Sequence, residues 1–256
     1  MESSAIRPIP PPPGLTRAGA TGALLALAAG AWVVTVERME GMDGGSGTAL
    51  GGIGWFMVSW ALMMAAMMLP SLVPAALVIA RAGERTVAAF VAGYVGAWTA
   101  AGLVGYLVFD GLRSLDIGFL AWDRAGRYVA AGVILAAAVY QFTTAKAGWL
   151  SRCRHPLEVG RGERSGVWGG LRGGIRHGGY CLGCCVALMA ALFALGVMSV
   201  TWMVVIAVLI AVERLSPWRA TGVYGVAVVL AVLGIWVAAA PGDLPGLTIP
   251  GSMAMG

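Results

Sequence analysis

Charged side chains are scarce in this sequence: Asp, Glu, Lys and Arg make up 11% of its 256 residues. An ordinary soluble domain has about a quarter of its residues charged. Hydrophobic residues account for 59% of the chain, and the mean hydropathy is +0.83. This balance excludes a typical soluble domain and predicts a protein embedded in lipid.

Motifs of common enzyme classes are also missing. The chain has two histidines, no strand-associated phosphate loop and no nucleophile elbow, so neither a conventional hydrolase nor a nucleotide-dependent enzyme is indicated. The net charge is +5, but the basic residues flank apolar runs and form no basic domain. The sequence therefore favours a non-enzymatic function and gives no reason to expect a nucleic-acid partner.

Long apolar runs, by contrast, are plentiful. A membrane-spanning helix needs about 20 apolar residues, and seven candidate runs occur, at 18–36, 53–72, 87–109, 127–145, 180–197, 200–213 and 220–240. We predict an all-α, polytopic transmembrane helical bundle of about seven helices in the lipid bilayer. The fifth and sixth runs are short for two crossings and predict a short or re-entrant hairpin.

The segments outside these runs complete the predicted domain organisation. Residues 1–17, which include the run Pro10 to Pro13, are predicted to be a disordered cytoplasmic tail. Residues 18–240 form the predicted transmembrane domain, with a cytoplasmic loop at 146–179. Residues 241–256 are predicted to be a flexible extracytoplasmic tail.

Lysine and arginine are distributed unequally between alternate connectors. Positively charged loops tend to stay in the cytoplasm. Of the chain's 17 basic residues, 13 fall in the set of connectors that contains the N-terminus and four in the other set. This asymmetry predicts a cytoplasmic N-terminus and an extracytoplasmic C-terminus.

Three of the chain's four cysteines lie together in the sequence CLGCC. Cys181, Cys184 and Cys185 have i, i+3, i+4 spacing, which places them on one face of a helix. Because Gly178 and Gly179 precede them, we expect the thiols near a helix N-terminus, where the helix dipole favours thiolate. The pattern fits metal binding, thiol redox chemistry or simple packing, since cysteine also behaves as a small hydrophobic residue.

Methionines cluster in the second apolar run, WALMMAAMMLPSLVP, at Met63, Met64, Met67 and Met68. Thioethers are soft ligands suited to Cu(I), although methionine is also a flexible filler of hydrophobic cores. The prolines at 70 and 74 predict that this helix kinks or ends.

The predicted orientation brings several of these groups to one side of the membrane. The inner half of the methionine-rich helix, the CLGCC segment, Cys153, His177 and Glu213 all map to the cytoplasmic side. Glu213 has a simpler interpretation as a helix-ending ion pair with the adjacent Arg214. The combination nevertheless suggests a metal site built from several segments.

Three blocks together, AMMLPSLVP, YQFTTAKAGWLSRCRHPL and GGYCLGCCVALMAALFALGVMSVTW with ERLSP, resemble an uncharacterised bacterial family of predicted metal-binding integral membrane proteins. The resemblance covers roughly residues 50–220 and implies a multi-helix inner-membrane protein with a metal site. It adds Met189 and Met198 to the candidate ligands. Val186 and Arg214 depart from the family pattern, which often has Trp and Lys there. The matching positions are Met67, Met68, Pro70, Tyr140, Gln141, Lys146, Cys153, Pro156, Gly179, Cys181, Cys184, Cys185, Met189, Met198 and Glu213.

Our leading hypothesis is a multi-pass protein of the bacterial inner membrane that binds a soft metal ion, with copper as the first candidate. Its role would be metal handling or delivery to a partner protein. The alternatives are a membrane thiol-redox protein that uses CLGCC, and a structural or assembly subunit of a membrane complex. The candidate metal ligands are Cys153, Cys181, Cys184, Cys185, Met67, Met68, Met189, Met198, His177 and Glu213.

Overall fold

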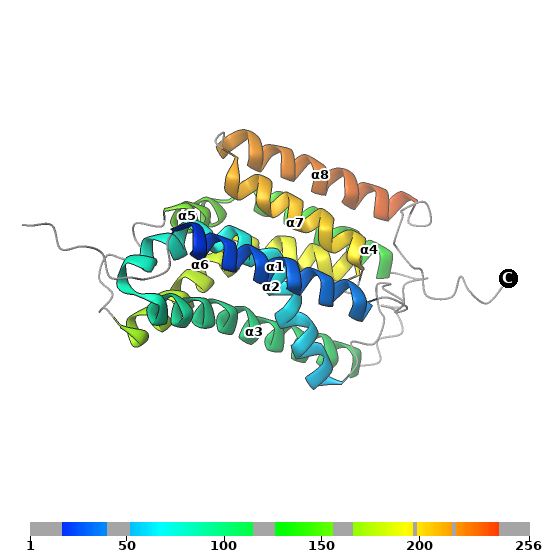
Figure 1. The fold of residues 1–256 in the computed structure, drawn as a ribbon. Helices are drawn as coiled ribbons and strands as arrows, with labels where there is room; N and C mark the ends of the chain where they lie inside the picture. The colour runs from blue at the N-terminus through cyan, green and yellow to red at the C-terminus, as the bar shows by residue number, and fades with distance from the viewer. Residues whose placement is uncertain are drawn as a thin grey trace, which may run out of the picture.

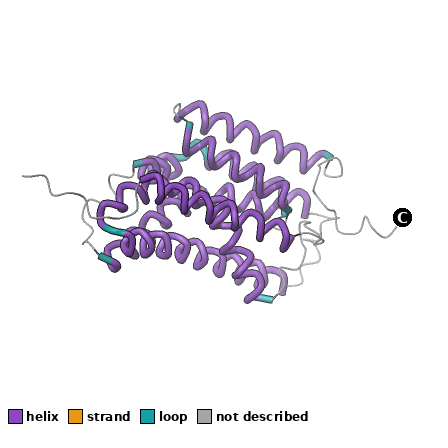
Figure 2. Tube along the Cα trace, in the orientation of Figure 1, coloured by secondary structure: helices purple, strands orange, loops and turns teal. Residues whose placement is uncertain are grey.

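The computed structural model describes residues 17–39, 52–114, 126–155, 166–196, 199–216 and 219–240. Within these ranges the chain forms helices and no strand, so the predicted all-α class is confirmed (Figures 1 and 2). The α-helices are α1 (Arg17–Met39), α2 (Ile53–Ile79), α3 (Glu84–Ser114), α4 (Arg127–Tyr140), α5 (Thr144–Arg154), α6 (Val167–Leu195), α7 (Val200–Leu215) and α8 (Arg219–Ala239), with a 3-10 turn at Ala80–Ala82. The predicted tails, the residue Met198 and most of the segment between α5 and α6 lie outside the described residues.

Five of these helices, α1, α2, α3, α6 and α8, are long and apolar enough to cross a membrane. The bent pair α4 and α5 would make a sixth span if it counts as one, whereas α7, with 16 residues, is shorter than a full crossing requires. Large apolar side chains such as Leu27, Val104, Val108, Val228 and Ile235 are exposed on the outside of the bundle. An outward apolar face of this kind is compatible with a membrane protein.

The helix α2 continues through both of its prolines, Pro70 and Pro74, to Ile79. The sequence allowed this helix to end at the prolines, but it does not end there. Both proline side chains are exposed, so their rings face away from the core. The opposite face buries Met63, Met64 and Met68, which makes α2 a central element of the core.

The run predicted at 127–145 is two helices rather than one. The chain turns at Gln141 to Thr143, and the axes of α4 and α5 differ by 68°. Thr143 caps the new helix, because its side chain accepts a hydrogen bond from the backbone N–H of Lys146 at 3.2 Å. The bend directs α5 across α6 and brings Cys153 toward the core.

The CLGCC helix also begins earlier than predicted. The sequence predicts a loop over 146–179, yet α6 starts at Val167 and places Cys181 roughly four turns into the helix. The expectation of thiols at a helix N-terminus is therefore wrong. The physical reason is a row of glycines, Gly170, Gly174 and Gly178, that faces α3.

Without side chains, these glycines allow the α3 and α6 backbones to approach closely. A Cβ atom at Gly174 would collide with the backbone of Phe90 and Tyr94, and one at Gly170 would collide with the carbonyl of Thr86. Small residues four positions apart are a recurrent interface between membrane helices. The glycines that suggest a loop in the sequence are therefore the residues that allow α3 and α6 to pack closely.

Several connections between helices lie at the same end of the bundle. The turn between α2 and α3, helix α5, the end of α7 and the start of α8 lie at one end, on the left in Figure 1, and α8 ends at the other. These elements carry basic residues: Arg85 at the start of α3, Lys146 and Arg152 on α5, and Arg214 near the end of α7.

Candidate metal-binding site

All four cysteines of the chain meet at one place. Cys181, Cys184 and Cys185 come from one face of α6, and their side chains are at most 1% exposed. Cys153, on α5, completes the group from a second helix. Its sulfur lies 3.7 Å from that of Cys184, which in turn lies 3.5 Å from that of Cys185. No disulfide links them.

Close packing of α5 on α6 explains how Cys153 reaches the other three. Gly183 lies between the cysteines of α6, and the Trp149 ring covers it so tightly that a Cβ atom there would strike the ring. Tyr140, at the end of α4, donates a hydrogen bond from its hydroxyl to the Gly183 carbonyl at 2.8 Å. These contacts fix the bent α4–α5 pair against the cysteine face of α6.

One cation lies among the sulfurs. The Nη2 atom of Arg214, from α7, lies 2.6 Å from the sulfur of Cys181, 3.4 Å from Cys184, 3.6 Å from Cys185 and 3.7 Å from Cys153. Its Nη1 atom donates to Ser71 Oγ on α2 at 2.7 Å, and Ser71 donates to the Met68 carbonyl at 2.8 Å. Arg214 thus connects α7, α2 and the cysteine cluster.

A second polar group borders the cluster. The hydroxyl of Tyr94, on α3, lies 2.9 Å from the sulfur of Cys181, at hydrogen-bond distance. His177, one turn before Cys181, packs between the rings of Phe90 and Tyr94, with centroids 5.9 and 5.8 Å away. Its Nδ1 atom is buried and makes no hydrogen bond. No hydrogen bond joins His177 to a cysteine sulfur among the described residues.

Glu213 is bound to a different residue from the one the sequence suggested. Its Oε2 atom lies 2.8 Å from the Nζ atom of Lys146, on α5, and both side chains are 1% exposed. Glu213 therefore forms a buried ion pair across two helices rather than an interfacial pair with Arg214. Consecutive helix residues point in different directions, so Glu213 faces Lys146 while Arg214 faces the cysteines.

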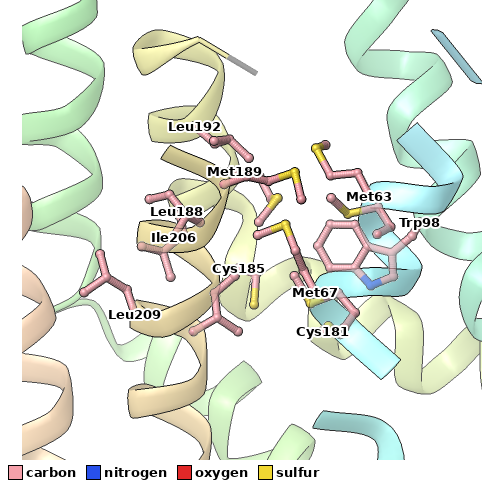
Figure 3. Packing of buried hydrophobic residues seen from close by; sticks show 14 of the residues in the cluster. Met63, Met67, Trp98, Cys181, Cys185, Leu188, Met189, Leu192, Ile206 and Leu209 are labelled. Atoms are coloured by element: carbon pink, nitrogen blue, oxygen red, sulfur yellow. The ribbon is translucent and has the colours of Figure 1, made fainter. Parts of the chain in front are cut away.

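The predicted methionine ligands lie in the adjoining core. Met67 and Met189 are each 6% exposed and Met68 is fully buried. Figure 3 shows Met63, Met67 and Met189 packed in the same region as Cys181 and Cys185, between α2 and α6. They place thioethers beside the thiols. The remaining predicted ligand, Met198, lies outside the described residues.

As the side chains stand, no group of three or more His, Cys, Asp and Glu residues within the described ranges is arranged to hold a metal ion. Two of the sulfur–sulfur distances can nevertheless be compared with those around a bound ion. A tetrahedral ion with metal–sulfur distances of about 2.3 Å separates its sulfurs by about 3.8 Å, close to the 3.5 and 3.7 Å observed here. Arg214 Nη2 occupies the position among the four sulfurs. The sequence patterns did not predict a cation there.

A large part of the chain is similar to a known protein family. The model of a family described as PpoB2, copper chaperone, matches residues 57–237, which span every described residue of the cysteine cluster and its surroundings. No curated protein and no solved structure matches the chain.

Proposed function

We propose that this chain, which belongs to the PpoB2 copper chaperone family, is a membrane-embedded copper-binding protein that carries Cu(I) on Cys153, Cys181, Cys184 and Cys185. The observation that supports this proposal best is the convergence of four sulfurs, from two helices, on a single point occupied by a cation. Thiolates are soft ligands and select Cu(I). The site accepts a positive charge at its centre, which is what copper binding requires.

The neighbouring methionines support the same cargo. Met67, Met68 and Met189 are buried in the core that adjoins the cluster. Weak thioether ligands beside strong thiolates would give Cu(I) a second position from which it can leave. A chaperone must release its ion, so a graded set of soft ligands suits delivery better than a closed structural site. His177 and Glu213 are not part of the proposed set, because each has other neighbours.

The location is part of the proposal. The excess of basic residues at the end of the bundle that holds α5 supports a cytoplasmic position for that end and for the N-terminus. The protein would then be a multi-pass protein of the inner membrane, with its cysteines near the reducing side, where thiols persist. A second membrane protein or a soluble acceptor would receive the metal.

Copper titration tests the proposed site. Purified anaerobically, the wild-type protein should bind Cu(I) in competition with a chromogenic chelator, and X-ray absorption should show sulfur ligands. The Cys181→Ala/Cys184→Ala/Cys185→Ala variant should lose more than about 100-fold in affinity, because it removes most of the thiolates. Cys153→Ala should weaken binding as well, since its sulfur closes the cluster from α5.

The matched control is Ser151→Ala, an exposed position on α5 that is close in sequence to Cys153. It should bind copper as the wild type does. Equal copper binding by the triple-alanine variant and the wild type would show that the cysteines are not the site. In that case the structural or assembly role, in which cysteines only pack, becomes the better explanation.

One distance favours the thiol-redox alternative. The sulfurs of Cys184 and Cys153 are 3.7 Å apart and come from different helices, so a small shift would bring them to the disulfide distance of about 2.05 Å. Mass spectrometry of thiols trapped in cells distinguishes the two functions. A copper carrier should retain four reduced cysteines, whereas a substantial fraction of a Cys153–Cys184 disulfide would support redox chemistry.

A further inference from the structure

We infer that Arg214 is a built-in competitor of the metal: its guanidinium holds the centre of the cysteine cluster in the metal-free protein and must withdraw when Cu(I) binds. This inference rests on the proposed function and concerns how the same site takes up and releases its ion. Its basis is the position of Arg214 Nη2, which lies within 3.7 Å of all four sulfurs.

Arg214 and copper cannot share this position. A guanidinium is permanently charged, and two cations at the same point repel each other while competing for the same sulfur acceptors. The guanidinium therefore stabilises the assembled cluster without metal and lowers its apparent affinity for metal. By linkage, the factor by which Arg214 lowers the affinity of the cluster for copper is also the factor by which bound copper weakens the interaction of Arg214 with the sulfurs.

The way in which Arg214 is held makes withdrawal feasible. On α2 its only described partner is Ser71, through Nη1, and its Nε atom is buried without a hydrogen bond. The side chain is half-buried, whereas the cysteines of α6 are almost fully buried. A guanidinium that returns to the sulfurs would, in turn, help to expel the ion, which is useful to a protein that delivers copper.

Ser71 links this movement to α2. Its hydroxyl accepts from Arg214 and donates to the Met68 carbonyl, beside the buried methionines. Movement of Arg214 therefore loosens a contact next to the candidate thioether ligands. The geometry couples the centre of the cysteine cluster to the methionine-rich helix through one side chain.

The test is a Cu(I) competition titration, followed by release to excess chelator, on wild type and four variants. Arg214→Leu should bind Cu(I) about 10-fold more tightly and release it correspondingly more slowly, within the usual range of coupling between sites. Arg214→Lys keeps a cation, so its Cu(I) affinity should stay within about 3-fold of wild type. Ser71→Ala removes the hydroxyl that accepts from Arg214 Nη1, so it should weaken the hold on Arg214 and tighten Cu(I) binding by about 3-fold. Arg85→Leu, which removes an exposed arginine at the start of α3, should change nothing.

A second measurement does not depend on the Cu(I) affinity. An arginine-specific dicarbonyl reagent, with mass spectrometry of the labelled peptide, should modify Arg214 faster in the copper-loaded protein than in the metal-free protein. Labelling of Arg85 should be the same in both. Unchanged or slower labelling of Arg214 on copper loading would contradict its withdrawal.

The outcomes separate this inference from the proposed function. Weaker or unaltered binding by Arg214→Leu, with cysteine-dependent binding by wild type, overturns the competitor role and leaves the copper site standing. If Arg214→Leu does not fold, an unaltered affinity in Ser71→Ala overturns the inference instead. Absence of cysteine-dependent copper binding in the wild type overturns both.

Discussion

Replacing Glu213 by alanine is expected to lower the free energy of unfolding by about 3–5 kcal/mol, the typical cost of leaving a buried charge without its partner. The carboxylate lies 2.8 Å from Lys146 Nζ, and both side chains are 1% exposed. The Lys146 ammonium has no described partner besides Glu213, so the variant leaves a buried charge uncompensated. Thermal or detergent-induced unfolding of the purified protein measures the loss.

The double variant Lys146→Met/Glu213→Leu identifies the cause. It removes both charges and fills the space with apolar groups, so it should recover most of the lost stability. The control Glu37→Ala removes an exposed carboxylate from α1 and should leave stability within about 0.5 kcal/mol of wild type. If Glu213→Ala unfolds like the wild type, or if the double variant is no better than the single one, the ion pair does not contribute in this way.

The ion pair also matters for the site, because it joins the two helices that supply Cys153 and Arg214. Lys146 precedes Cys153 by two turns on α5, and Glu213 is the neighbour of Arg214 on α7. A weakened pair would let α5 and α7 separate, and the cluster would lose its fourth sulfur. Stability and copper affinity should therefore fall together in Glu213→Ala.

The long apolar helices were the part of the fold that could be predicted from sequence. The runs at 18–36, 53–72, 87–109 and 220–240 correspond to α1, α2, α3 and α8, because an apolar run of this length has few alternatives to a helix. The positions at which a helix bends or breaks were harder to predict from the sequence. The bend at Thr143 depends on a side-chain cap and on packing of α5 against α6, and neither leaves a gap in the hydropathy pattern.

The start of α6 shows a conflict between local and tertiary signals. Glycine has a low intrinsic helix propensity, so the composition of residues 167–179 favours a loop. The close contact with α3 reverses that preference, and the glycines become the reason why the helix fits. The signal that could have revealed this was the spacing of Gly170, Gly174 and Gly178 at intervals of four.

The candidate site was partly accessible to the same kind of reasoning. Helical spacing alone places Cys181, Cys184 and Cys185 on one face. Cys153 was also a candidate ligand from the sequence, but its contact with Cys184 depends on the direction that the Thr143 bend gives to α5. Sequence reasoning missed Arg214 because it paired this residue with Glu213. Consecutive residues on a helix face different neighbours, so a buried Glu-Arg sequence at a helix end calls for two separate partners, and here they are Lys146 and the cysteines.

Replacing Gly174 by alanine should destabilise the protein by about 2 kcal/mol or more, although alanine is the better helix former. A Cβ atom there meets the Phe90 carbonyl and the Tyr94 nitrogen, which are backbone atoms of α3 and cannot rotate away. The two helices must separate to accommodate it. Because Tyr94 contacts Cys181, the same displacement should weaken copper binding.

The matched control lies on the same helix. Gly179 is exposed, and a Cβ atom added there would have nothing within 4 Å, so Gly179→Ala should leave the α3–α6 contact unaltered and stabilise α6 by about 0.5–1 kcal/mol. Opposite signs at two glycines five residues apart would separate tertiary contact from helix propensity. Stabilisation of both variants would mean that α3 and α6 are not in close backbone contact, and the placement of the cysteines on α6 would need another explanation.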